Sequence, residues 1–312
     1  MKGGESTWTQ PVIVSDDPER SERDPSLFLT PSGEVWIMYT AQVSRNARPD
    51  SKFNLQYTAE IRRKISTDNG ETWGKTETMF AEPGSFCRQK IQILKSGRWI
   101  FSNWMCFNDD THNGSDITVI QISDDGGQTW RPVEVPDSRG KVHCNIIEMS
   151  EGKLTALFRS RSADHIYIAF SNDNGNTWSS PVRTELPNNN SSISAIKLQS
   201  GALAVIYNPV KMNDDVNTTV WPSIRCPVAI AISDDNGRTW PYIRLVEHGE
   251  GCLGISNRKS NRRYEYPVMM QKADGIIACA YSFGDRRCVK YIEVTEAWVR
   301  GCKRDKEELW FV

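Results

Sequence analysis

The chain has 312 residues, 38% of them hydrophobic, and its 38 basic and 39 acidic side chains nearly cancel. This balance gives no support for binding nucleic acid or another polyanion through bulk charge. No run of about 18 apolar residues occurs, so we expect no membrane span. The first eight residues lack the apolar segment of a signal peptide.

The eight cysteines show no Cys-x-x-Cys pair, and most lie in apolar runs such as the one around Cys279. This pattern is typical of reduced thiols in a core rather than of a disulfide framework or a metal site. We therefore expect a cytoplasmic protein without a metal ion or other cofactor. The sequons at Asn113, Asn190 and Asn217 are then accidental. If a signal segment precedes this sequence in the natural chain, the protein is secreted instead.

Five stretches share one pattern along the chain: an apolar strand, a tight turn ending in Gly, and a second apolar strand. Such a pattern predicts a β-hairpin. Helical periodicity is absent. The five stretches are residues 23–41, 87–101, 143–159, 193–207 and 266–281.

Four copies of the phrase Ser-x-Asp-x-Gly-x-Thr-Trp, here called boxes, lie between the hairpins. Asp and Asn side chains bond backbone N–H groups two residues on, Gly supplies positive φ, and Trp can fill the gap between neighbouring sheets. We interpret the box carboxylates as turn staples on the rim rather than as calcium ligands or catalytic groups. The boxes span residues 66–73, 123–130, 171–178 and 233–240, with the stapling residues Asp68, Asp125, Asp173 and Asp235.

Each hairpin, together with the strands around the following box, makes a four-stranded antiparallel blade, and repeated blades predict an all-β propeller. We count five blades in one domain, residues 1–312, or six if one degenerate blade is hidden. The last blade has no box after it, so we expect residues 4–14 to supply its outer strand and close the ring. We expect a monomer.

The boxes resemble the Asp-box, or BNR, repeats of the sialidase (neuraminidase) superfamily. That resemblance covers almost the whole chain as architecture. It implies a six-bladed propeller in which three arginines hold a sugar carboxylate. It also implies a tyrosine nucleophile, a glutamate that activates the tyrosine, and an aspartate as general acid.

By local motif, Arg159, Arg225 and Arg23 resemble the three arginines, Tyr266 the nucleophile and Asp50 the acid. Arg161 and Arg287 are further candidates for substrate binding. His143 stands where the family has its glutamate. A neutral His can accept a proton but cannot place a negative charge beside the phenol.

The resemblance therefore implies an exo-acting glycoside hydrolase that removes a terminal carboxylate sugar of the sialic acid type, with His143 as the base. A first alternative is a uronate-directed polysaccharide lyase, in which His143 or Tyr266 removes a proton and no acid at Asp50 is needed. A second alternative is a propeller that binds a glycan without turnover.

Overall fold

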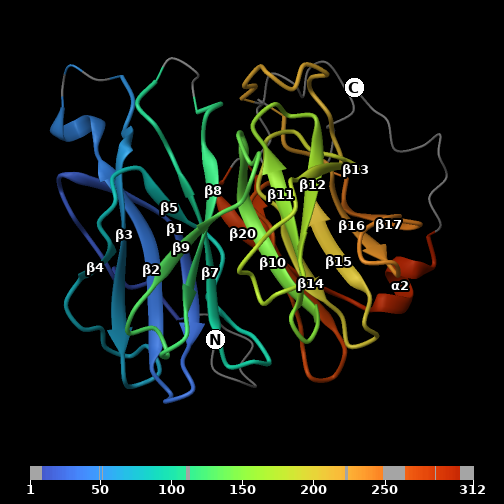
Figure 1. Cartoon of the computed structure of the whole chain (residues 1–312), viewed down its shortest axis with the longest axis horizontal. Helices are drawn as coiled ribbons and strands as arrows, with labels where there is room; N and C mark the ends of the chain where they lie inside the picture. The colour runs from blue at the N-terminus through green and yellow to red at the C-terminus, as the bar shows by residue number, and fades with distance from the viewer. Residues whose placement is uncertain are drawn as a thin grey trace. The chain divides into compact units, whose positions relative to one another are not determined.

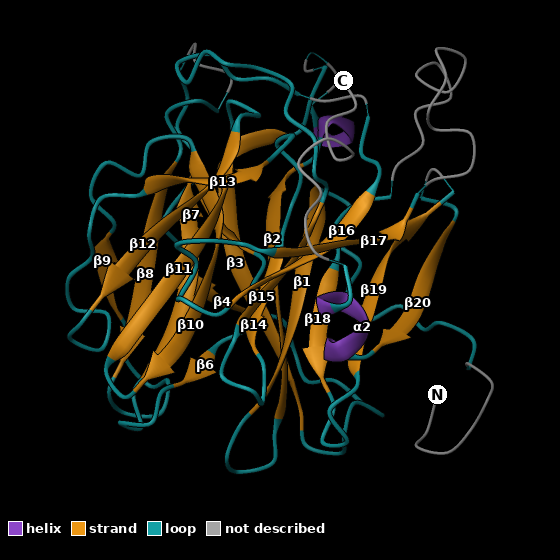
Figure 2. Cartoon of the chain, turned by 90° about the vertical axis from the view of Figure 1, so that its right-hand side faces the viewer, coloured by secondary structure: helices purple, strands orange, loops and turns teal. Residues whose placement is uncertain are grey.

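The computed structural model describes residues 9–48, 50, 52–109, 113–221, 224–248, 264–284 and 286–302. The chain divides into two compact units, residues 1–88 and 89–312. It is an all-β protein of the β-propeller class, as predicted, and its blades are antiparallel sheets in sequence order (Figures 1 and 2). The assignment of a single domain stays a prediction.

The first unit contains the first blade. Its sheet has the order β1-β2-β3-β4, and β5 follows it. One turn of 3₁₀-helix lies in the insert after β2. The elements are β1 (Arg20–Leu29), β2 (Val35–Val43), η1 (Arg45–Ala47), β3 (Leu55–Ser66), β4 (Glu77–Phe80) and β5 (Ser85–Cys87).

The second unit contains the second to fifth blades, in which each strand pairs with the next along the chain. The second blade has β6 (Gln92–Ile93), β7 (Trp99–Met105), β8 (Ile117–Ser123) and β9 (Arg131–Glu134). The third has β10 (Lys141–Ser150), β11 (Lys153–Ser160), β12 (His165–Ser171) and β13 (Val182–Pro187). The fourth has β14 (Ser194–Lys197), β15 (Leu203–Tyr207), β16 (Val228–Ser233) and β17 (Tyr242–Glu247). The fifth has β18 (Val268–Gln271), β19 (Ile277–Phe283) and β20 (Cys288–Val294).

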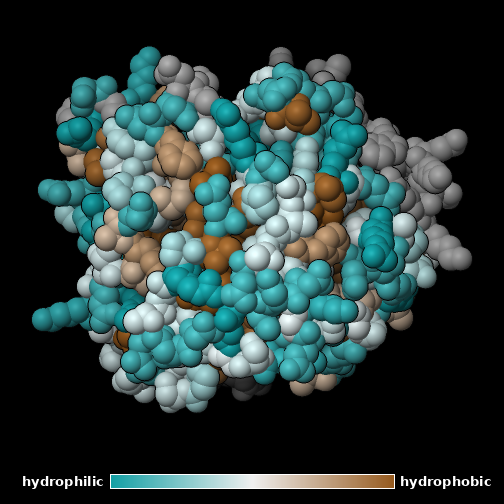
Figure 3. All heavy atoms as spheres, viewed as in Figure 1, coloured by the Kyte–Doolittle hydropathy of each residue, from teal (hydrophilic) through white to brown (hydrophobic). Residues whose placement is uncertain are grey.

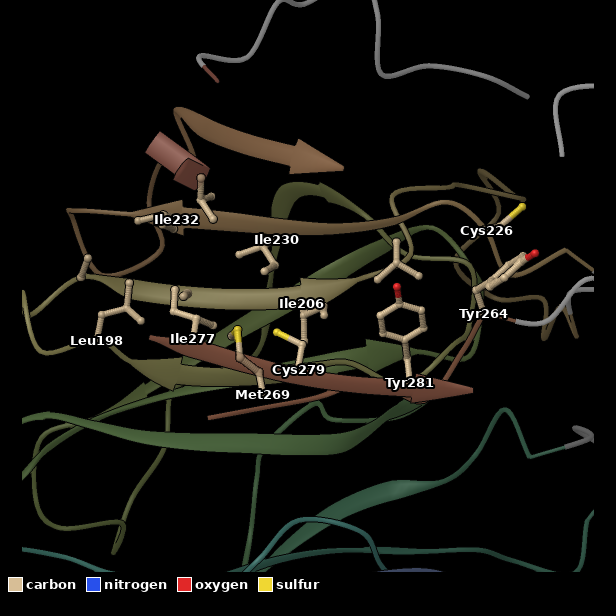
Figure 4. Packing of buried hydrophobic residues seen from close by; sticks show 14 residues of the cluster. Leu198, Ile206, Cys226, Ile230, Ile232, Tyr264, Met269, Ile277, Cys279 and Tyr281 are labelled. Atoms are coloured by element: carbon tan, nitrogen blue, oxygen red, sulfur yellow. The ribbon is translucent and has the colours of Figure 1, made fainter. Parts of the chain in front are cut away.

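The cores of the second unit lie between successive blades, because middle strands such as β11 and β15 bury side chains on both faces. Figure 4 shows one such layer, in which Ile230 and Ile206 of the fourth blade approach Ile277 and Cys279 of the fifth. Hydrophilic residues cover most of the molecular face shown in Figure 3. The innermost strand β10 lies next to β7 and β14, and β14 next to β18. The starts of these inner strands are therefore neighbours.

The boxes are turn staples, as the sequence predicts. In the third box, Ser171 Oγ donates to Asp173 Oδ1 across 2.8 Å. The same carboxylate accepts from the backbone N–H of Thr177 at 2.9 Å and from its hydroxyl at 2.6 Å. The other three boxes repeat these bonds with the same partners.

Two of the box tryptophans, Trp178 and Trp240, also fill gaps between blades, as predicted. Trp240 is fully buried in a core shared with Ile168 of the third blade. A Cβ on Gly237 would lie 2.6 Å from Ile168 Cδ1, and Gly237 has a φ of +85°, so both space and conformation require glycine there.

Two predictions about the chain ends need correction. Residues 9–17 form no strand, so the predicted N-terminal closing strand is absent from that stretch, and residues 1–8 lie outside the described residues. A short helix, α2 (Glu296–Arg300), follows β20, although no helix was predicted. It packs on the fourth blade, where Arg300 forms two hydrogen bonds with Asp234 at 2.9 and 2.7 Å (Figure 2). The helices in the described residues are too short to span a bilayer.

Candidate active site

Two equivalent positions at the starts of inner strands carry the candidate site. His143 lies nine residues before the turn glycine Gly152 (152−143=9), and Tyr266 lies nine before Gly275 (275−266=9). Both have positive φ, 52° and 55°, which is uncommon and costly for a residue other than glycine. The sequence reasoning that placed both residues at a strand start is thus supported by a shared and unusual backbone conformation.

His143 is a buried neutral imidazole with both ring nitrogens occupied. Its Nε2 lies 3.2 Å from Nη1 of Arg159, and its Nδ1 lies 3.0 Å from Oγ of Ser192. Arginine has no acceptor, so Nε2 must accept and Nδ1 must carry the proton. The ring stacks on Trp104 with centroids 4.4 Å apart. In this geometry both ring nitrogens of His143 are engaged, and the ring orients Arg159.

Arg159 is the central cation. It is the last residue but one of β11, its side chain is only 1% exposed, and its Nε donates to Oδ1 of Asn190 across 2.7 Å. Its Nη2 has no hydrogen-bond partner among the described residues. Burial lowers the pKa of Arg159 to about 9, while the phenol of Tyr266 raises it through charge and a side-chain hydrogen bond. The guanidinium is therefore a cation at neutral pH and is surrounded by uncharged partners.

Tyr266 lies against two more arginines. The Cζ atoms of Arg225 and Arg286 lie 5.2 and 5.7 Å from the centre of its ring. Glu265 is fully buried and pairs with both of these arginines, one through each carboxylate oxygen. Because it is already engaged twice, Glu265 serves to hold the two arginines around the tyrosine.

A fourth arginine is held in place by a carboxylate. Arg161 donates to Oδ2 of Asp116 from Nε at 3.1 Å and from Nη2 at 2.6 Å. Trp221, 48% exposed, lies over Arg161 and Arg159, whose Cζ atoms are 5.0 and 5.8 Å from its ring.

The cluster carries an excess of positive charge. Among the residues described above, four arginines face two carboxylates, a net charge of +2 (4−2=2). Unpaired buried charge is costly, so a protein keeps it where an anion binds. The arrangement can bind a carboxylate and place it beside the hydroxyl of Tyr266.

The second unit thus brings Arg159, Arg161, Arg225, His143 and Tyr266 into one linked cluster. The roles of Arg287, Arg23 and Asp50 stay predictions. Arg287 is exposed, and its neighbour Arg286 reaches Tyr266 instead. Arg23 and Asp50 belong to the first unit, where Arg23 lies 3.5 Å from Ser21 Oγ and Asp50 is exposed. The described residues contain no cluster of metal-binding side chains.

Sequence reasoning missed the polar loop that supports the arginine. Five consecutive side chains, residues 188–192, are fully buried, although all are Asn or Ser. Asn190 binds Arg159 and also donates to the carbonyl of Val220, so its sequon is buried. Ser192 lies nine residues before Gly201 (201−192=9), the position that His143 and Tyr266 occupy in their blades. That shared spacing was the signal that could have found it.

Comparison with known proteins gives the class. Residues 1–279 match the family described as BNR repeat-like domain, and the chain belongs to this family. No curated protein sequence matches the chain.

Solved structures show the same fold at low identity. The Hadza microbial sialidase Hz136 superposes with a TM-score of 0.69 and 16% identity, over 90% of this chain and 54% of that one. The NanB sialidase from Streptococcus pneumoniae gives 0.66 and 14%, over 90% and 57%. The intramolecular trans-sialidase from Ruminococcus gnavus gives 0.69 and 15%, over 96% and 87%. The chain thus has the sialidase fold and spans about half the length of the first two proteins.

Proposed function

We propose that the protein is an exo-acting, sialidase-like glycoside hydrolase for a terminal sugar that bears a carboxylate. The observation that carries this proposal is the state of Arg159, a buried cation with only uncharged partners and an unused Nη2. An arginine that already paired with a carboxylate would have little charge left for a ligand. Arg159 keeps its charge and part of its planar fork, which suits bidentate carboxylate binding.

In this mechanism Arg159 and Arg225 bind the carboxylate and Arg161 adds positive charge behind them. Tyr266 reacts as the phenolate after its proton passes to solvent. Its oxygen attacks the anomeric carbon, and the glycosidic bond breaks as the leaving oxygen takes a proton from Asp50. Water then releases the sugar from the tyrosine and returns a proton to Asp50. Two displacements give retention of configuration. Negative charge that develops on the phenol oxygen lies beside the Arg159 guanidinium. Asp50 remains the proposed general acid because of its place in the insert of the first blade. Arg23 and Arg287 remain proposed binding residues on the sequence argument alone.

The lyase alternative is favoured by one observation. The two buried carboxylates of the cluster, Glu265 and Asp116, are both engaged by arginines. Neither of these carboxylates is left to take a proton from Tyr266. In a lyase, Arg159 would neutralise a uronate carboxylate and Tyr266 would remove the adjacent proton. The electron pair would form a C=C bond as the β oxygen leaves, taking the proton back from the hydroxyl of Tyr266.

One experiment separates the candidates. The protein is incubated with a fluorogenic α-sialoside and, separately, with uronate oligosaccharides. Release of the fluorophore, lost in Tyr266→Phe, supports hydrolysis. Ultraviolet absorbance from an unsaturated uronate, without sialoside turnover, would replace the proposal with the lyase. Binding of either saccharide without any turnover would leave a glycan-binding propeller.

A further inference from the structure

We propose that a groove between the third and fourth blades is a second anion site, which binds the oxyanion group of an acidic saccharide. This inference is independent of the proposed function. The groove has a volume of about 380 Å³, within the range of small-molecule sites. Its lining includes Lys153, the first residue of β11, whereas Arg159 lies near the other end of that strand. The groove therefore lies at the other end of the third blade from the candidate active site.

At the preceding interface, between the second and third blades, the corresponding position holds an arginine that is paired with a carboxylate. Arg98, the residue after a turn glycine, donates to both oxygens of Asp124 at 2.6 and 3.1 Å. It also donates from Nη1 to the carbonyl of Asn174 at 3.0 Å and to Oδ1 of Asn176 at 2.9 Å. Arg98 is thus neutralised by a carboxylate of its own blade and hydrogen-bonded to the box of the third blade.

In the next interface the same three positions carry different charges. Lys153 takes the position of Arg98, Asn172 that of Asp124, and Arg238 that of Asn176. This interface therefore has the amide of Asn172 in place of the carboxylate of Asp124. It also has a second cation, Arg238, in place of the amide of Asn176. Lys153 and Arg238 both line the groove, and neither has a hydrogen bond or ion pair from its side chain in the described part of the chain.

Three carboxylates near the groove are already engaged, and the exposed Glu151 in the turn before Lys153 is not among the lining residues. Glu148 accepts from the backbone N–H groups of Lys95 and Gly152, and Asp173 and Asp235 hold their boxes. Two cations in one groove repel each other unless an anion lies between them. The geometry therefore favours a ligand that carries negative charge.

The rest of the lining fits a saccharide better than a bare ion. Asn172 and Asn236 offer amide groups that can bond sugar hydroxyls, and the partly buried ring of Phe170 offers an apolar surface for a sugar face. A carboxylate or sulfate on the sugar would lie between Lys153 and Arg238.

The test is calorimetric titration of the Arg159→Met protein, in which the candidate active site no longer binds anions. The probes are 3′-sialyllactose, a 3-sulfated lactose, neutral lactose and inorganic sulfate. We expect at least one acidic saccharide to bind, and lactose and sulfate to bind at least tenfold more weakly. The double variant Lys153→Gln/Arg238→Gln should weaken saccharide binding about tenfold or more, since each charged hydrogen bond contributes. Lys75→Gln/Arg139→Gln removes the same charge from exposed positions elsewhere and should change nothing.

A second variant tests the converse. Lys153→Arg/Asn172→Asp/Arg238→Asn rebuilds the filled interface in the groove, so it should abolish binding and raise the melting temperature. Equal binding of inorganic sulfate and acidic saccharide, or binding that survives both groove variants, would overturn the proposal. Saccharide binding in the parent protein that disappears entirely with Arg159→Met would also overturn it, while leaving the proposed function intact.

Discussion

Nε2 of His143 accepts a hydrogen bond from Nη1 of Arg159 across 3.2 Å. The imidazole thus takes the place in which a carboxylate would neutralise the arginine. A neutral acceptor fixes the direction of the guanidinium and leaves its charge for a ligand. We therefore propose that His143 positions Arg159, in place of the role as base expected from the sequence.

We therefore expect His143→Gln to retain substrate turnover. The glutamine oxygen can accept from Arg159 and its amide can donate to Ser192, so kcat and KM should each stay within about tenfold of the parent values. His143→Leu cannot accept, and should raise KM by tenfold or more through the disordered arginine. Steady-state kinetics on the active substrate measures both. A general base would behave differently: Gln would then lower kcat as much as Leu does.

Replacing Arg159 should separate stability from function. Arg159→Met removes a buried, unneutralised cation and fills its space with an apolar chain, so the free energy of unfolding should rise by about 1–3 kcal/mol. Carboxylate binding should be lost. Arg159→Lys keeps the charge without the planar fork and should weaken binding by about 1–3 kcal/mol. Denaturant unfolding and ligand titration measure the two effects. A large loss of stability in Arg159→Met would mean that the arginine is structural.

The box carboxylates should affect stability without affecting the site. Asp173→Ala leaves the backbone N–H of Thr177 and the hydroxyls of Ser171 and Thr177 without their acceptor. We expect the free energy of unfolding to fall by about 1–3 kcal/mol. Substrate affinity of the folded protein should not change. Loss of affinity at an unaltered melting temperature would contradict the staple interpretation.

The same staples predict how stability depends on acid. Hydrogen bonds from the box threonines hold the pKa of Asp68 and of Asp125 at about 2, below the ordinary value of 3.8. A lowered pKa contributes stability above pH 4, and this contribution is lost as the pH falls through 2. The melting temperature should therefore fall over this window, and Asp125→Asn should fall less steeply. Parallel curves for the two proteins would show that Asp125 has no part in the acid transition.

The fold was predictable because its signals are local. Ser, Asp, Gly and Thr of a box bond within one turn, so their spacing is fixed in the sequence. The turn glycines likewise mark each hairpin. Contacts between site residues that are far apart in the sequence have no such fixed spacing. Glu265 is next to Tyr266 in the sequence, but its role depends on its ion pairs with Arg225 and Arg286 from other segments. The burial of Asn190 agrees with the prediction that its sequon is accidental, but its hydrogen bond to Arg159 could not be read from the sequence. The contact between Arg286 and Tyr266 was not predicted, because adjacent residues at a turn point in different directions and the sequence does not show which one faces the tyrosine.

The C-terminal helix α2 has a consequence for the chemistry. The fifth blade carries Glu265, Tyr266 and Arg286, yet no box follows it, and the helix after its last strand docks on the fourth blade instead. We therefore expect the placement of Tyr266 to depend on this contact between α2 and the fourth blade. Trimming by a carboxypeptidase past Arg300 would remove the contact with Asp234, loosen this blade and slow turnover without touching a single residue of the site.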